Sequence, residues 1–177
     1  YGAGGAATSN RTLEIASLIK NKYNMEPVAH LTCIDAKEDE IKKILRDLKN
    51  EGIENILALR GDGNPDTAGR SNDFKYASDL IQFIKKIDDF NVSGACYPEG
   101  HIDCRNLDKD IENLKMKQEA GASHFISQLF LDNEYFYSFM DETIEKGITV
   151  PIKAGIMLVI NKKQIERITS ICGSNDH

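Results

Sequence analysis

The stretch Asn55-Ile56-Leu57-Ala58-Leu59-Arg60-Gly61-Asp62 decides the fold, because an apolar run of strand length ends abruptly in a cation, a glycine and a carboxylate. Four further apolar runs, at residues 27–33, 92–96, 124–130 and 150–160, contain or lead into polar or glycine residues of the same kind. Strands of a parallel sheet are buried on both faces, and ligands bind beyond their carboxyl ends. The pattern therefore predicts an α/β protein with a ligand site at those ends.

The spacing of the runs supports this prediction. Their polar or glycine endings, His30, Asp62, His101, Gln128 and Gly155, follow one another at intervals of 27 to 39 residues. One strand, one crossover helix and two loops need about that length. Apolar residues recur at helical spacing within residues 41–48, 77–84, 107–114, 136–140 and 165–172. We expect Ser9 or Asn10 to cap a first helix, and Asp35 with Glu38 and Asn161 with Gln164 to cap two later ones.

The length of the chain limits how much of a barrel it can form. With 177 residues and 41% hydrophobic content, the chain can bury one core. A closed eight-stranded α/β barrel needs about 250 residues. Five strands and a stub ahead of Tyr1 predict an α/β fold that is a partial (β/α)8 TIM barrel, roughly strands 2 to 7 with the intervening helices. Residues 1–177 would form a single incomplete barrel domain that lacks strand 1 and strand 8.

Composition excludes several classes of function. A net charge of −6 disfavours nucleic acid as a partner, because phosphate binding depends on clustered Lys and Arg. No apolar stretch approaches the roughly 18 residues of a membrane span, and no signal peptide is visible, so we expect a cytoplasmic protein. The four cysteines form no C-x-x-C pair, and we expect reduced thiols. A zinc site is not expected at His30-x-x-Cys33, because residues three apart on a strand point to opposite faces.

Two glycine-containing segments are candidates for ligand contacts. Gly2–Ala7 satisfies the dinucleotide pattern G-x-G-x-x-A, but no acidic residue ends the next strand, so a flexible turn and a phosphate or flavin contact both stay open. Arg60-Gly61-Asp62 places a cation, a residue that permits close backbone approach and a carboxylate at one strand end. It indicates either a ligand site or an Arg–Asp pair that orders a loop.

Three further features extend the candidate site. Tyr97-Pro98-Glu99-Gly100-His101 combines an aromatic ring suited to stacking on a planar ligand with a histidine and a turn. Asp110, Asn113 and Lys117 share one helix face, turned away from Ile111 and Leu114, which indicates a solvated face or a polyol or phosphate contact. Gln128 lies in an apolar strand, where its amide needs a ligand or a neighbouring backbone group as a partner.

Several strings follow one another along nearly the whole chain: Tyr1–Gly5, Glu26–Cys33, Leu57–Asp62, Tyr97–His101, Ala120–Ala122 with Gln128–Phe130, and Gly155–Met157. Taken together, they resemble the methylenetetrahydrofolate reductase family. The resemblance implies a flavin-dependent (β/α)8 barrel that passes a hydride from NAD(P)H to FAD and then to 5,10-methylenetetrahydrofolate. The product, 5-methyltetrahydrofolate, belongs to one-carbon metabolism and methionine biosynthesis.

The resemblance also implies roles for individual residues. Asp62 and Gln128 would be catalytic, Asp62 lying near the flavin ring and the folate, and Gln128 contacting the pterin or the nicotinamide. It implies an FAD site lined by Tyr1, Ala3, His30, Arg60, Gly61, Asp62, Tyr76, Ala77, Tyr97, His101, Asp110, Asn113 and Lys117. No metal is implied. The partner is a folate substrate, and a homo-oligomer is compatible with the family.

The chain departs from the family pattern at three points. The general-acid glutamate of the family follows the first barrel strand, which residues 1–177 are expected to lack. We therefore expect this stretch of chain to be inactive alone and its full-length parent to be active. Met116 stands where a basic residue is common, and Ala154 and Leu158 stand where prolines are usual. Two alternative functions stay open: a non-catalytic flavin- or nucleotide-binding module, and another flavin barrel oxidoreductase such as a proline dehydrogenase.

Overall fold

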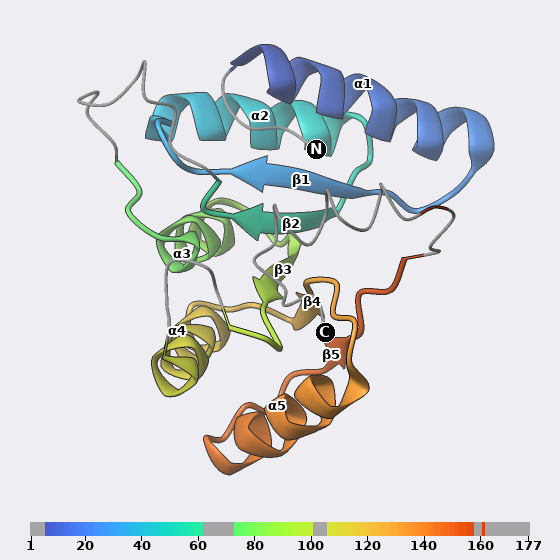
Figure 1. Cartoon of the computed structure of the whole chain (residues 1–177). Coiled ribbons are helices and arrows are strands. Elements are labelled where there is room, and N and C mark those ends of the chain that lie inside the picture. Colours follow the sequence, from blue (N-terminus) through green and yellow to red (C-terminus); the bar gives the residue numbers. More distant parts are fainter. Residues whose placement is uncertain (1–5, 62–72, 101–105, 158–160, 162–177) are drawn as a thin grey trace. The chain divides into compact units, whose positions relative to one another are not determined.

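The structure is a computed structural model that describes residues 6–61, 73–100, 106–157 and 161, with side chains from residue 11 onward. Within this part of the chain, helices and strands alternate (Figure 1). The helices are α1 (Ala6–Tyr23), α2 (Glu38–Asn50), α3 (Ala77–Ile87), α4 (Leu107–Glu119) and α5 (Asn133–Glu145). The strands are β1 (Val28–Thr32), β2 (Asn55–Leu59), β3 (Asn91–Cys96), β4 (His124–Ser127) and β5 (Ile152–Lys153).

The strands form one sheet in the order β1-β2-β3-β4-β5. β1 pairs with β2, β2 with β3, and β4 with β5, each in parallel. Parallel strands that are neighbours both in sequence and in space require crossover connections, and the helices between the strands supply them. The predicted α/β fold with a helix between successive strands is therefore confirmed, and this arrangement is that of a segment of a (β/α) barrel.

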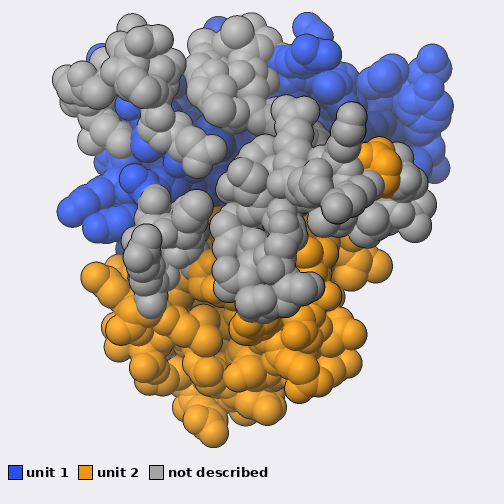
Figure 2. Space-filling view, viewed as in Figure 1, with its two compact units in different colours: residues 1–94, 120–123 blue, residues 95–119, 124–177 orange. Residues whose placement is uncertain are grey.

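The chain divides into two compact units, coloured separately in Figure 2. Unit 1 comprises residues 1–94 and 120–123, and unit 2 comprises residues 95–119 and 124–177. Unit 1 contains α1, α2, α3, β1, β2 and most of β3, whereas unit 2 contains α4, α5, β4 and β5. That both units belong to a single domain stays a prediction.

The core of unit 1 lies between its strands and helices. Along β1, Ala29 and Leu31 are buried whereas Val28 and His30 are exposed, so only one face of this strand is covered. Side chains at helical spacing in α2 and α3 are also buried: Ile41, Leu45, Leu48, Leu80, Ile81 and Ile84. Each such side chain stabilises the fold by about 1.5–3 kcal/mol relative to an exposed one. The predicted helical spacing in residues 41–48 and 77–84 thus marks real packing faces.

Unit 2 has its own apolar core. Phe125 of β4 and Phe139 of α5 are almost fully buried, as are Ile111 and Leu114 of α4. β5 is short and contributes the pairs Phe125↔Ile152 and Ile126↔Lys153. Only residues 152–153 of the apolar run 150–160 therefore form a strand in the described part of the chain.

Two predicted helix starts are wrong. α1 begins at Ala6, so Ser9 and Asn10 lie inside the helix, because the Ala6-Ala7 pair ahead of them favours helix strongly. α2 begins at Glu38 with Lys37 at the N-cap, and the Glu40 carboxylate accepts a hydrogen bond from Lys37 N at 3.1 Å. Asp35 has φ +59° and belongs to the preceding turn. The predicted cap at Asn161 with Gln164 lies outside the described residues. Among those residues, no helix combines the length and apolar character needed to cross a membrane.

Candidate functional site

In unit 1, the ladder between β1 and β2 continues past both strands. Cys33 N donates to Leu59 O at 3.1 Å, and Ile34 N donates to Arg60 O at 2.8 Å. Gly61 follows with φ +84°, and a Cβ there would stand 3.0 Å from both Thr32 Cβ and Ile34 Cγ2. Only glycine fits this backbone and this space. The result is a tight corner directly after Arg60, which is exposed.

His30 and Cys33 lie on opposite sides of β1. His30 keeps contact with solvent, but the protein around the imidazole partly desolvates it and lowers its pKa below the usual value, which favours the neutral ring. Cys33 is fully buried, and its Sγ lies 3.6 Å from Tyr76 O and 3.8 Å from Arg60 O. Burial raises the pKa of the Cys33 thiol to about 11, so the group stays protonated and donates weakly to these carbonyls. Cys33 thereby links the ends of β1 and β2 to the start of α3.

The start of α3 presents an aromatic ring. Tyr76 is the N-cap residue and is 49% exposed, whereas Ala77 behind it is buried. The Asp79 carboxylate accepts hydrogen bonds from Lys75 N and Tyr76 N, each at 2.9 Å, and so fixes the backbone that carries the ring. Asp79 was missed in the sequence analysis. An acidic residue three positions after the N-cap residue is nevertheless a recognisable capping signal.

In unit 2, a small recess lies at the end of β3. It is lined by Ala95, Cys96, Tyr97, Asp110, Leu114, Lys117 and Phe139. Lys117 Nζ donates to Ala95 O at 2.8 Å, and burial lowers the pKa of this amine. Burial raises the pKa of the Cys96 thiol to about 12. The volume, about 10 Å³, leaves space for about one water molecule, so a larger ligand would lie over the recess rather than in it.

The predicted common face of α4 is only partly correct. Asn113 is exposed, but Lys117 and Asp110 both line the recess together with buried Leu114. The long Lys117 side chain reaches Ala95 O of β3, and a count of positions on a helix does not show such a contact. The structure therefore brings Tyr97, Asp110 and Lys117 together at the end of β3.

Gln128 follows the last residue of β4 directly. Its backbone N–H donates to Cys96 O at 2.8 Å, and its carbonyl accepts from Ser127 Oγ at 2.9 Å. The side chain is exposed, and its Oε1 accepts a hydrogen bond from Leu129 N at 2.9 Å. The backbone N–H of Leu129 thus satisfies the oxygen of the Gln128 amide. Gly155 N donates to Ser127 Oγ at 2.8 Å, which joins this strand end to the segment after β5.

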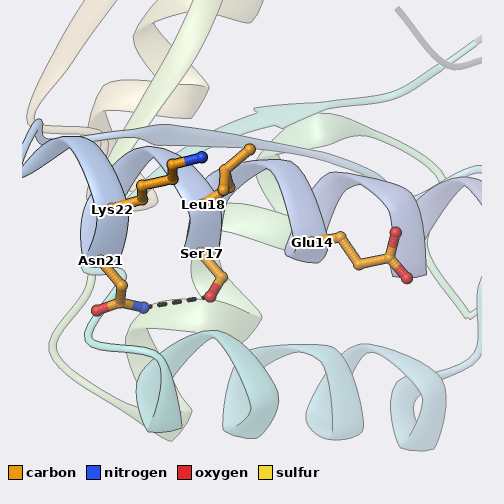
Figure 3. Close-up of a pocket in the computed structure, with 5 residues that line it drawn as sticks. All are labelled: Glu14, Ser17, Leu18, Asn21 and Lys22. Carbon is orange, nitrogen blue, oxygen red and sulfur yellow. Dashed lines mark hydrogen bonds between the residues drawn. The ribbon is translucent and has the colours of Figure 1, made fainter.

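A surface depression on α1 has a different character. It is lined by Glu14, Ser17, Leu18, Asn21 and Lys22, and Figure 3 shows Ser17 and Asn21 on the side of α1 that faces α2. Asn21 Nδ2 donates to Ser17 Oγ at 3.2 Å and to Glu51 Oε2 at 3.2 Å, and Ser17 Oγ also donates to Glu51. These polar groups therefore already bond to one another and join α1 to the end of α2. The candidate site stays at the strand ends, where the predicted site residues lie.

Four residues predicted for the site, Tyr1, Ala3, Asp62 and His101, lie outside the described residues. Of the others, His30, Arg60, Gly61, Tyr76 and Ala77 belong to unit 1, and the structure places the last four around the ends of β1 and β2. Tyr97, Asp110, Asn113, Lys117 and Gln128 belong to unit 2. Convergence of all these side chains on one ligand stays a prediction.

The order of these strand-end groups along the chain can be compared with known families. Residues 1–175 match the family model described as methylenetetrahydrofolate reductase. The chain belongs to the methylenetetrahydrofolate reductase family. It is 42% identical over 171 residues to 5,10-methylenetetrahydrofolate reductase of Escherichia coli (strain K12), covering 97% of this chain and 56% of that protein. The corresponding enzyme of Salmonella typhimurium (strain LT2) is 40% identical, with the same coverage.

A plant relative and solved structures complete the comparison. The probable methylenetetrahydrofolate reductase (NADH) of Oryza sativa subsp. japonica is 38% identical over 97% of this chain and 31% of that protein. The chain thus spans little more than half the length of the bacterial relatives and slightly less than a third of the plant one. Phosphonopyruvate hydrolase in complex with oxalate and Mg²⁺ shares the fold with a TM-score of 0.64 at 14% identity, over 82% of this chain and 51% of that one.

A Clostridium thermocellum protein described as binding two copies of 5-methyl-5,6,7,8-tetrahydrofolic acid gives a TM-score of 0.62 at 18% identity, over 87% of this chain and 53% of that one. At these identities, the two solved structures show the fold alone. They support the conclusion that this member of the methylenetetrahydrofolate reductase family forms part of a (β/α) barrel.

Proposed function

We propose that the protein that carries this chain is a flavin-dependent methylenetetrahydrofolate reductase. It would pass a hydride from NAD(P)H through FAD to 5,10-methylenetetrahydrofolate and release 5-methyltetrahydrofolate. The observation that carries the proposal is the identity of about 40% to bacterial enzymes of this name across 97% of the chain. The strand-end residues of both units add chemical support, because they fit the parts of a dinucleotide.

The side chains of unit 1 suit one portion of FAD. The exposed Arg60 guanidinium can pair with a phosphate, and the half-exposed Tyr76 ring can stack on a planar group. Gly61, where a Cβ would meet Thr32 and Ile34, lets the backbone turn tightly directly after Arg60 and so sets where the guanidinium starts. We propose that His30, Arg60, Gly61, Tyr76 and Ala77 hold FAD, with Tyr1, Ala3 and Asp62.

The side chains of unit 2 suit another portion of the cofactor. Tyr97 offers a second aromatic ring, and Asp110 and Asn113 supply oxygen and amide groups for a polyol chain. Lys117 is held by Ala95 O, so its ammonium group is fixed before a ligand arrives. We propose that these four residues and His101 complete the FAD site.

FAD, when bound, supplies the hydride-transfer chemistry between the nicotinamide and the folate. The residues of the chain bind and orient the reactants. Gln128 stands exposed at the end of β4 with its backbone held at both the N–H and the carbonyl, so its amide can hydrogen-bond a flat heterocycle in a fixed position. Asp62 would stabilise positive charge on the folate and disfavour negative charge on the reduced ring.

Anaerobic spectroscopy of the complete protein tests this function. We expect a yellow preparation that loses its flavin absorbance on addition of NADH or NADPH and regains it on addition of methylenetetrahydrofolate. Formation of 5-methyltetrahydrofolate in proportion to the nicotinamide oxidised would confirm the reaction. A flavin that is bleached but not reoxidised by the folate would indicate a binding module instead. Reoxidation coupled to another substrate, such as the proline–pyrroline pair, would indicate a different oxidoreductase.

A further inference from the structure

Ser127 is the last residue of β4, and the residue is only 5% exposed. A buried hydroxyl in this position needs partners, because an unpaired polar group away from water is costly. The two partners are both backbone groups that lie beyond strand ends. Ser127 Oγ donates to Gln128 O at 2.9 Å and accepts from Gly155 N at 2.8 Å. The hydroxyl therefore forms a bridge between the residue after β4 and the segment after β5.

The bridge acts on a segment that has little room to move. A Cβ added to Gly155 would lie 2.1 Å from Ser127 O, so the two backbones are already in close contact at this point. On the other side, Gln128 N donates to Cys96 O at the end of β3. The Gln128 backbone is thus held by β3 through its N–H and by Gly155 through the Ser127 hydroxyl.

The Gln128 side chain depends on this backbone. It is exposed, and its Oε1 accepts from Leu129 N, the next backbone group along the chain. A rotation of the Gln128 peptide would carry the amide with it and would also turn the Leu129 N–H that fixes its oxygen. Contacts between a protein and a reacting ligand lose much of their effect when the protein group is displaced by about 1 Å.

We propose that Ser127 is a positioning residue that sets the orientation of the Gln128 amide by bridging Gln128 O to Gly155 N. The proposal rests on the proposed function, with the Gln128 amide contacting the pterin or the nicotinamide in turn, as the family resemblance implies. On this proposal, Ser127 affects the reaction with NAD(P)H and the reaction with the folate through Gln128, without contacting FAD itself. Retention of flavin should therefore be insensitive to the Ser127 hydroxyl, whereas both half-reactions should depend on it.

Three variants of the complete protein separate positioning from general stability. Ser127→Ala removes the bridge, and Ser127→Thr keeps the hydroxyl. Ser93→Ala is the matched control, because Ser93 is also a buried strand serine, 1% exposed, whose Oγ donates to a single carbonyl, Ile56 O at 3.0 Å. Ser127→Cys is a fourth, milder variant, since a thiol is a weak donor of similar size, and it keeps the comparison with Ser127→Thr if Ser127→Ala does not fold.

Hydrogen exchange and stopped-flow kinetics provide the readouts. We expect Ser127→Ala to keep its flavin, to lose protection at the Gly155 amide and to slow both half-reactions by about 10- to 100-fold. Ser127→Thr and Ser93→Ala should stay close to wild type in both half-reactions. Ser127→Cys should be slowed to a smaller extent than Ser127→Ala and should remain slower than Ser127→Thr.

Equal half-reaction rates in Ser127→Ala and Ser93→Ala would overturn the proposal, as would equal rates in Ser127→Thr and Ser127→Cys. Failure of the proposed function looks different. In that case the wild-type flavin itself is not reoxidised by methylenetetrahydrofolate. Separately, unchanged protection of the Gly155 amide in Ser127→Ala would show that the Ser127 hydroxyl does not hold this amide.

Discussion

Burial determines the chemistry of two cysteines beside the candidate site. Cys33 and Cys96 are both free thiols in the core at strand ends, and burial raises their pKa values to about 11 and about 12. Neither thiol is therefore a nucleophile at neutral pH. Cys33 instead spans two backbone carbonyls, Arg60 O and Tyr76 O, which places it among the residues that shape the site. The sequence predicted reduced thiols, and both cysteines that the structure describes are free.

This burial predicts the reactivity of the two thiols. At pH 8 the thiolate fraction of Cys33 should be on the order of one in a thousand and that of Cys96 one in ten thousand, against about a tenth for a thiol of pKa 9.0. Iodoacetamide should leave both residues unmodified in the native protein and alkylate both in urea. Peptide mass spectrometry measures this, and native labelling at the rate of a free cysteine peptide would contradict the prediction.

Asp62 belongs to the same scale, although its position lies outside the described residues. Asp62→Asn removes a negative charge that would disfavour an anionic reduced flavin, so the reduction potential of the flavin should rise. Reduction of the folate should slow on the order of 100-fold. A redox titration and the oxidative half-reaction measure the two effects. Asp141→Asn, at an exposed position of α5, is the charge-matched control, and an unchanged potential in Asp62→Asn would remove this role.

At the scale of elements, helix starts help to place the site. α3 begins beside the ends of β1 and β2, because Cys33 Sγ contacts Tyr76 O and Asp79 holds the amides of Lys75 and Tyr76. Apolar spacing predicted the existence of α2, α3, α4 and α5 correctly. It did not predict their first residues, because a cap depends on which backbone amides are left unpaired in the folded turn.

Removal of the α3 cap should therefore affect both stability and cofactor binding. Asp79→Ala should lower the free energy of unfolding by about 1 kcal/mol, because two backbone amides lose their acceptor. It should also weaken FAD binding, since the backbone that carries Tyr76 is no longer fixed. Urea unfolding and flavin titration measure the two effects. Asp141→Ala removes an exposed carboxylate within α5 and serves as the control; equal flavin affinity in both variants would separate α3 from the FAD site.

At the scale of the whole molecule, the order β1-β2-β3-β4-β5 joins five strands in one sheet, while two compact units divide the chain. The sequence predicts a single domain. Small single domains unfold cooperatively, whereas separate domains give separate transitions. The two descriptions therefore differ in a measurable way.

If the chain folds within one domain, β2 and β4 should lose their protection together. Hydrogen exchange of the complete protein at increasing urea should give one common free energy of opening for the amides of Ile56 in unit 1 and Phe125 in unit 2. Phe125→Ala, which empties a fully buried site, should lower that free energy by about 3–5 kcal/mol at both positions. An effect confined to unit 2 would show two independently folding units.

The sequence by itself determined the fold class and the approximate positions of the strands, because burial and helical period leave a local pattern in the order of residues. The family was indicated by the resemblance of its strings to known enzymes, not by periodicity. Tertiary structure alone decided which groups meet there: Cys33 with Tyr76, Lys117 with Ala95, and Ser127 with Gly155. These partners lie far apart in the chain, and their contacts depend on strand register and on how closely backbones approach. No local pattern encodes those distances, so a residue such as Ser127 shows its role only once the strands are paired.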